Sequence, residues 1–169
     1  MPSFLWNKVI KKSLYNGLRF SSQKVMLEDY EILTSVFLKI NRMVFIDNNL
    51  YFYRQNSNSI THNVNVEIIS ENNITIAKRE QMILEAYPDL LTAVKIGRAY
   101  RALSYLTFLR KICDDYEIKQ KEQKNLRKYL YLFLLDEDIN IKKKLAALLL
   151  SVNLRIYDTM LRLYSKECF

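Results

Sequence analysis

Glycine and proline are almost absent from this chain, and their scarcity constrains its fold more than any other feature of the sequence. The 169 residues include two glycines and two prolines. Because β-sandwiches and β-barrels need turn residues at most strand connections, so few of them argue against those folds. Gly17 and Gly97 also lie too far apart to form a glycine-rich phosphate loop. The sequence therefore predicts a mainly helical chain and excludes nucleotide loops of that kind.

Apolar residues recur at helical spacing through the second two thirds of the chain. Helices are predicted over residues 66–86, 90–113 and 139–166. Pro88 separates the first of these helices from the second, because proline cannot continue a helix. The acidic run Asp136-Glu137-Asp138 is predicted to open the last helix and to cap its start.

The first third of the chain has both helical and strand-like patterns. From Glu28 to Ile40 the apolar residues fall on one face, which predicts an amphipathic helix. The β-rich runs Met43–Ile46 and Leu50–Tyr53, separated by Asp47-Asn48-Asn49, predict a small β-hairpin. A two-stranded hairpin needs a sheet or helices to pack on. The fold class is therefore expected to be mainly α with a small β-hairpin.

The net charge of +8 favours anionic partners such as nucleotide phosphates, lipid headgroups or nucleic acid. Cys113 and Cys168 are too few for a disulfide framework, and with His62 they cannot make a four-ligand zinc site. We therefore expect reduced thiols and a cytoplasmic location. No run approaches the ~20 apolar residues that cross a bilayer, so secretion and membrane spanning are not expected.

Six short motifs follow one another in the first 62 residues. They are Phe4-Leu5-Trp6-Asn7-Lys8-Val9, Ser13-Leu14-Tyr15 with Gly17-Leu18-Arg19-Phe20, Glu28-Asp29, Val44-Phe45-Ile46-Asp47, Leu50-Tyr51-Phe52-Tyr53-Arg54-Gln55 and Asn58-Ser59-Ile60-Thr61. This succession resembles the C-terminal part of bacterial family 2 glycosyltransferases, the GT-A-fold enzymes of capsule, O-antigen and exopolysaccharide gene clusters. The family's Arg-Phe-Pro-x-Gly loop reads Arg19-Phe20-Ser21-Ser22-Gln23 here, so a different placement of that loop is expected.

The resemblance implies that residues 1–62 are the acceptor-side C-terminal portion of an α/β GT-A domain and that residues 63–169 are a helical extension. It implies inverting transfer of a sugar from a nucleotide-sugar to a growing cell-surface polysaccharide or a lipid-linked acceptor. The family's donor-binding half and its Asp-x-Asp metal motif are not found ahead of Trp6. The ligands of the Mg²⁺ or Mn²⁺ expected for the intact enzyme are therefore expected outside this chain, which alone is expected to be inactive.

By the same resemblance, Asp29 matches the catalytic base, the carboxylate that takes the proton from the acceptor hydroxyl. Glu28 would orient Asp29 or contact the acceptor. General base catalysis of this kind typically contributes ~10² to 10⁴-fold to the rate. The local sequence leaves open that Glu28 and Asp29 only cap the helix that follows them.

The other candidate site residues lie in the matching motifs on either side of this acidic pair. Trp6 and Tyr53 are aromatic platforms suited to the apolar face of a sugar ring, and core packing explains them equally well. Asn7 belongs to the same motif as Trp6. Lys8 and Arg54 would face phosphate or acceptor, although most Lys and Arg are solvated surface residues.

Two other functions stay open. A basic helical module without catalysis would bind nucleic acid or an acidic protein through residues 95–128. Such a module would need its cations on one open face. The glycosyltransferase function, by contrast, expects no nucleic-acid partner. A truncated, inactive remnant of the transferase would share the same fold. The last predicted helix, preceded by Lys142-Lys143-Lys144, either packs on the chain or makes a peripheral membrane contact through residues 142–166, at the inner face of the plasma membrane.

Overall fold

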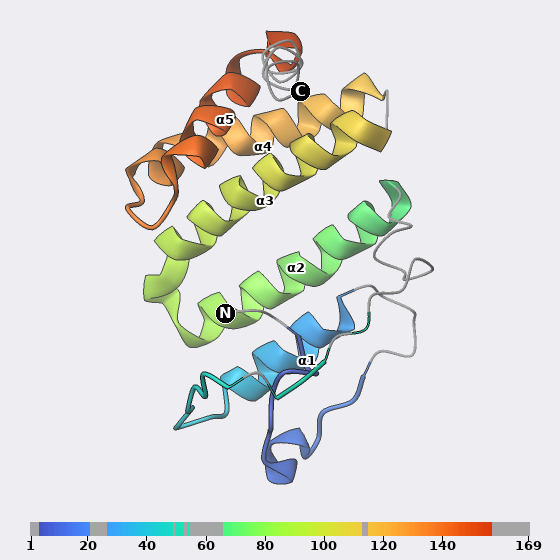
Figure 1. Ribbon diagram of the computed structural model, residues 1–169, viewed down its shortest axis with the longest axis vertical. Helices are drawn as coiled ribbons and strands as arrows, with labels where there is room; N and C mark the ends of the chain where they lie inside the picture. Colours follow the sequence, from blue (N-terminus) through green and yellow to red (C-terminus); the bar gives the residue numbers. More distant parts are fainter. Residues whose placement is uncertain are drawn as a thin grey trace. The chain divides into compact units, whose positions relative to one another are not determined.

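The computed structural model of the chain describes residues 4–20, 27–48, 50–52, 54, 66–112 and 115–156. Its helices are η1 (Lys12–Tyr15), α1 (Glu28–Phe37), α2 (Val66–Ala86), η3 (Pro88–Leu90), α3 (Leu91–Ile112), α4 (Tyr116–Leu135) and α5 (Ile141–Val152), where η marks a 3-10 helix (Figure 1). Within those described ranges there is no strand. The mainly helical class is thus confirmed, and the helices predicted over 66–86 and 90–113 correspond to α2 and α3.

The chain divides into two compact units, Met1–Pro88 and Asp89–Phe169. The first unit contains α1 and α2, and the second contains α3, α4 and α5. The boundary predicted between residues 62 and 63 separates a transferase portion from an extension, falls outside the described residues and stays a prediction.

The small β-hairpin is not seen, so that part of the predicted fold is wrong for the described residues. Residues 42–47 and 50–52 are irregular, while Asn49 and Tyr53 lie outside the described part. Their apolar side chains face solvent, with Phe45 82% and Phe52 98% exposed. A two-stranded hairpin is stable only when one of its faces is buried against other elements, and neither run has a buried face among its described residues. The turn residues Asp47 and Asn48 therefore do not produce a hairpin on their own.

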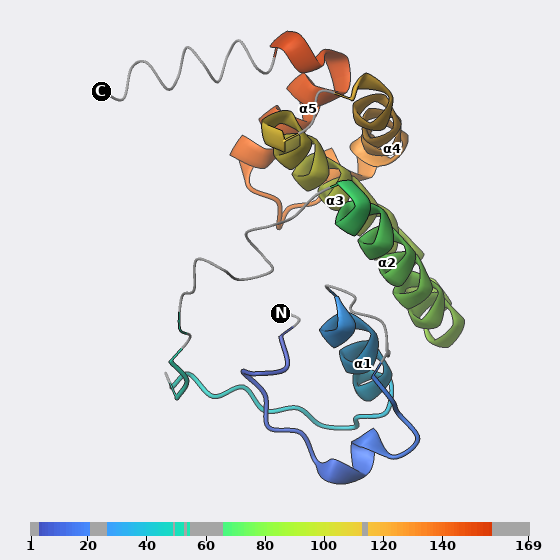
Figure 2. The ribbon, with the colours of Figure 1, turned by 90° about the vertical axis from the view of Figure 1, so that its right-hand side faces the viewer.

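The second unit is a bundle in which α3 packs against both α4 and α5, and α4 packs against α5 (Figure 2). Its core consists of Ala99, Ala102, Leu103 and Leu106 of α3, Leu126 and Phe133 of α4, and Ala147 and Leu150 of α5. Small alanines on α3 allow a close approach of the neighbouring helix, and Phe133 fills the remaining space. Burial of this apolar surface stabilises the unit by roughly 25 cal/mol for each Å² removed from water.

Single side chains define the helix starts in this unit. Asp115 accepts hydrogen bonds from the backbone N–H groups of Glu117 (2.9 Å) and Ile118 (3.3 Å) and so caps α4. Asn140 caps α5 by accepting from the N–H of Lys142 at 2.8 Å.

The acidic run does not open the last helix, which corrects that prediction. Asp136 ends α4, and its carboxylate accepts from the N–H of Asp138 at 2.9 Å, within the turn. The neutral side-chain amide of Asn140 caps α5 instead. The helix ends at Val152, where Asn153 adopts an extended conformation, and residues 157–166 of the predicted helix lie outside the described residues.

Basic side chains of the second unit contact aromatic rings. Lys95, Arg98 and Arg101 are half-buried, and Arg98 donates from Nη1 to the Tyr129 hydroxyl at 3.2 Å. This hydrogen bond lowers the pKa of Tyr129, although burial of the hydroxyl opposes the effect.

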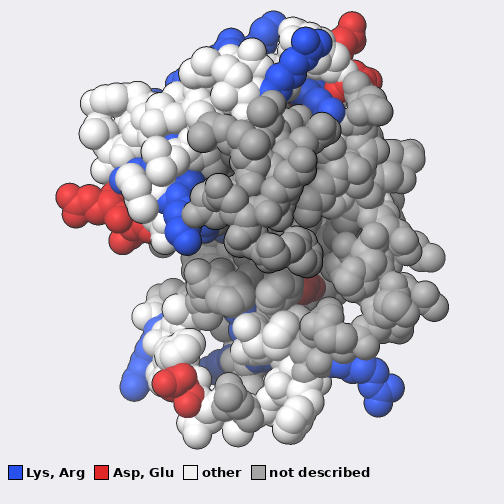
Figure 3. All heavy atoms as spheres, turned by 45° about the horizontal axis from the view of Figure 1, so that its top comes forward, with Lys and Arg blue, Asp and Glu red and all other residues white. Residues whose placement is uncertain are grey.

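On the described part of the face in Figure 3, Lys and Arg lie at several separate places. The Lys111 side chain lies outside the description, so the basic-module alternative stays a hypothesis.

Candidate functional site

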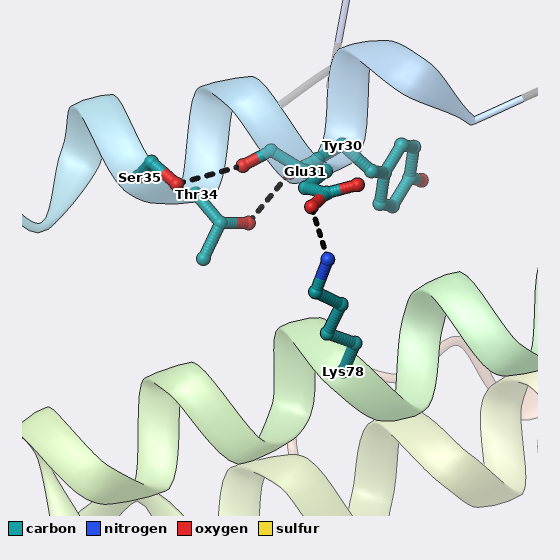
Figure 4. A network of polar contacts seen from close by, with 5 residues as sticks. All are labelled: Tyr30, Glu31, Thr34, Ser35 and Lys78. Carbon is teal, nitrogen blue, oxygen red and sulfur yellow. Dashed lines mark hydrogen bonds and ion pairs between the residues drawn. The ribbon is translucent and has the colours of Figure 1, made fainter. Parts of the chain in front are cut away.

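Contacts with α2 fix which way α1 faces. The Lys78 ammonium forms an ion pair with Glu31, and the Thr34 hydroxyl donates to the backbone carbonyl of Tyr30 at 2.7 Å (Figure 4). Arg79 donates from Nε to the Thr34 hydroxyl at 3.1 Å, and its guanidinium lies 5.0 Å from the centre of the Tyr30 ring. The side of α1 that carries Glu31 therefore faces α2.

Buried apolar residues of α1 lie on the side opposite Glu31, the side that also carries Asp29. Ile32, Leu33 and Val36 are almost completely buried, at three-to-four spacing. Residues two apart on a helix differ by about 200° around its axis. Asp29 therefore faces away from the side on which Glu31 meets α2, and the first turn of α1 presents its carboxylate to another part of the unit.

The carboxylate of Asp29 binds the N-terminal segment of the chain. Its Oδ2 accepts a hydrogen bond from the backbone N–H of Leu5 at 3.1 Å, and the side chain is half-buried. Leu27, at the N-cap position, makes no side-chain capping bond. Among the described residues, Asp29 thus bonds an amide 24 positions earlier and no amide of its own helix. A cap of α1 would show the opposite pattern.

Residues 5–8 form a turn that carries two of the candidate residues. The backbone N–H of Lys8 donates to the carbonyl of Leu5 at 3.1 Å. The Lys8 ammonium donates to the carbonyl of Phe4 and to Oδ1 of Asn7, both at 2.6 Å. Asn7 therefore orients Lys8, and the turn holds both residues beside the amide that binds Asp29.

The charges of Lys8 and Asp29 interact. Burial lowers the pKa of Lys8, because desolvation disfavours the charged ammonium, and the nearby carboxylate of Asp29 opposes this by favouring the charge. Asp29 therefore lies near enough to Lys8 to favour its charged form.

Trp6 stacks with two other aromatic rings. Its ring lies 5.3 Å from that of Phe4 and 4.8 Å from that of Tyr51, at interplanar angles of 22° and 26°. Trp6 remains 40% exposed. A stack that is open to solvent offers a flat apolar surface, which suits the C–H face of a sugar ring. Because Leu5 directly precedes Trp6, the stack adjoins the segment that the Asp29 carboxylate binds.

The structure brings Trp6, Asn7, Lys8 and Asp29 together. Glu28 and Arg54 are exposed, with no described contact to that group, and Tyr53 lies outside the described residues. Phe4 and Tyr51 were not predicted as part of the site. Their signal was present in the sequence, because each lies two positions from a predicted aromatic residue.

Two further features of the described residues concern metal binding and membrane spans. No three or more His, Cys, Asp or Glu side chains in the described part of the chain gather to hold a metal ion. The ligands of the Mg²⁺ or Mn²⁺ that the resemblance implies therefore remain a prediction. Within the same residues, no helix combines the length and the apolarity needed to cross a bilayer.

Comparison with known proteins relates part of the chain to a glycosyltransferase. No protein-family model and no solved structure matches the sequence. Glycosyltransferase GlyG of Streptococcus pneumoniae serotype 4 is 38% identical over 60 residues, which cover 36% of this chain and 19% of GlyG. The chain thus matches less than a fifth of the length of that relative.

Proposed function

We propose that this chain forms the acceptor side of an inverting glycosyltransferase with the GT-A fold of family 2. The enzyme would transfer a sugar from a nucleotide-sugar to a growing cell-surface polysaccharide or a lipid-linked acceptor. The observation that carries the proposal is the half-buried Asp29 carboxylate, held by the Leu5 amide beside the open stack on Trp6. The similarity to GlyG supports the same activity class.

In this proposal Asp29 acts as the general base. The acceptor oxygen forms a bond to the anomeric carbon, its proton passes to the carboxylate, and the bond from that carbon to the nucleotide phosphate breaks with its electron pair on the phosphate. Leu5 engages Oδ2 of Asp29. In the part of the chain that is described, Oδ1 has no hydrogen-bond donor, so this oxygen is the one assigned to the proton.

The neighbouring residues position the acceptor. Trp6 and Tyr51 provide a surface on which a sugar ring stacks, while the Lys8 ammonium would donate a hydrogen bond to an acceptor hydroxyl or phosphate. Asn7 orients Lys8, and Glu28 is assigned to the exposed rim. A bound Mg²⁺ or Mn²⁺ would offset charge on the leaving phosphate. Its ligands and the donor pocket are assigned to a donor-binding half outside this chain.

Two tests separate acceptor binding from catalysis. Trp6 is the only tryptophan, so titration of this chain with bacterial polysaccharide fragments should change its fluorescence and report on the stack alone. In the complete transferase, which joins this sequence to a donor-binding half, Asp29→Asn should abolish transfer with donor binding near normal. Asp47→Asn, which alters an exposed carboxylate, is the matched control. Turnover that survives Asp29→Asn would refute the role of the base.

Calorimetry of this chain tests the assignment of the donor pocket. With manganese present, we expect no measurable binding of UDP- or GDP-sugars. Micromolar affinity would show that the donor pocket lies within these residues. An inactive remnant would keep the aromatic stack and the Asp29 hydrogen bond, and it would differ in showing no transfer by the complete protein with any donor.

A further inference from the structure

Helix α5 has an exposed apolar stripe on one side. Ile141, Leu145, Leu148 and Val152 are 66%, 52%, 39% and 70% exposed. They follow one another at spacings of four, three and four residues, which places them in one narrow sector of the helix surface. The opposite sector, with Leu150, is buried in the core formed with α3 and α4. These four exposed residues are called the α5 stripe below.

Lysines flank the α5 stripe on both sides. The helix carries three lysines and no acidic residue. At about 100° per residue, Lys142 lies roughly 90° to one side of the stripe and Lys144 roughly 70° to the other. Lysines in the first turn of a helix are disfavoured by the helix dipole, so helix stability does not account for them. Lysine stems can lie along apolar surface while the ammonium groups remain in water.

A cavity adjoins one edge of the stripe, and its lining, which includes Leu103 and Ala146, is more apolar than polar. It has a volume of about 410 Å³ and lies between α3 and α5, where Tyr100, Ser104, Thr107, Lys142 and Lys143 are among its lining residues. The Lys143 ammonium contacts the Tyr100 hydroxyl and lies 4.7 Å from the centre of its ring. Lys142 belongs both to this cavity and to the border of the stripe. Hydroxyl groups and two ammonium groups suit an anionic group.

We infer that α5 lies in the interface of an anionic lipid bilayer. The α5 stripe would enter the boundary between headgroups and acyl chains, and Lys142 and Lys144 would remain at the level of the phosphates. The cavity beside Lys142 would then face the headgroups. Charge complementarity selects this occupant, because the lysines line both edges of the stripe and no carboxylate lies on the helix. The inference does not depend on the proposed glycosyltransferase activity.

The test is cosedimentation of the full chain with vesicles. We expect binding to mixed phosphatidylcholine and phosphatidylglycerol vesicles, and much weaker binding to phosphatidylcholine alone. Lys142→Gln with Lys144→Gln should lower the partition coefficient on the order of 20-fold, from about fivefold for each charge near the surface. Leu145→Ser and Val152→Ser should each lower it roughly tenfold, because half or more of each side chain is available for transfer.

Matched variants outside α5 separate the stripe from general charge and apolarity. Lys121→Gln with Lys124→Gln removes the same charge from exposed positions of α4, and Ile74→Ser removes an exposed aliphatic side chain from α2. These variants should retain binding within about twofold of the unchanged protein, after allowance for the weak, screened effect of distant charges. Circular dichroism should show the same helix content for every variant.

Three results would overturn the inference. Equal binding to both kinds of vesicle would show that the lysines do not select anionic lipid. An equal loss of vesicle binding in the control variants would show that α5 is not the binding surface. Sedimentation velocity without lipid provides the third. A dimer that dissociates in Leu145→Ser would show that the stripe is covered by a second copy of the chain, whereas a monomer supports the lipid surface.

Discussion

Replacement of Asp29 by alanine tests whether its carboxylate holds the N-terminal segment on α1. The substitution removes the acceptor of the Leu5 N–H and the negative charge next to Lys8. A hydrogen bond to a charged group typically contributes about 1.5–3 kcal/mol. Since the carboxylate is only half-buried and the bond measures 3.1 Å, the lower end applies. We expect a loss of about 1.5 kcal/mol, which increases the population of the detached segment roughly tenfold.

The assay uses the sole tryptophan, Trp6, because it lies in that segment. Detachment should separate Trp6 from Tyr51, shift its emission to longer wavelength and make it more accessible to acrylamide. Urea unfolding followed by circular dichroism measures the change in the free energy of unfolding. Asp29→Asn keeps a neutral acceptor and should cost about half as much.

Two comparisons decide the interpretation. Asp47→Ala removes an exposed carboxylate of the same unit and should leave both the emission and the free energy unchanged. If Asp29→Ala gave the emission and quenching of the unchanged protein, the hydrogen bond to Leu5 would not hold the segment, and the site argued from it would fail.

Three further predictions concern the second unit. Arg98→Gln should raise the pKa of Tyr129 toward its ordinary value, seen in the absorbance of tyrosinate against a Tyr129→Phe reference. Because the folded state favours ionised Tyr129, the Arg98 contact should add stability as pH rises through the lowered pKa toward the ordinary one, and pH-dependent urea titrations measure this. Phe133→Ala should cost about 3–5 kcal/mol in urea unfolding, whereas exposed Leu135→Ala should cost far less. Asn140→Ala should cost about 1 kcal/mol and reduce the helix signal, since it removes the cap of α5.

The sequence was sufficient to predict helices where spacing and punctuation agreed. Pro88 separates α2 from α3 as predicted, since both the missing N–H and the ring oppose helix continuation. It was insufficient where several capping residues stood together. Asp136, Asp138 and Asn140 are all good N-cap residues, and local sequence does not distinguish Asn140, which caps α5, from the other two.

The candidate site was predictable in its residue types and less so in its contacts. The motif containing Trp6, Asn7 and Lys8 directly follows Leu5, whose N–H binds Asp29. The partner of Asp29 is a backbone amide, and every residue carries one, so no residue type marks it in the sequence. Tyr51 is a stacking partner of Trp6, whereas Tyr53, the aromatic residue predicted for the site, lies outside the described residues.

The irregular residues 43–48 and 50–52 also bear on how this protein behaves at high concentration. Short apolar segments with high β propensity that remain accessible can pair between molecules and seed cross-β aggregates. Arg42, Asp47 and Arg54 interrupt or bracket these segments, and charges in such positions act as gatekeepers against intermolecular pairing. Replacement of these three charged residues by neutral ones would shorten the lag time of any fibril growth, and it would leave the stability of the helices unchanged.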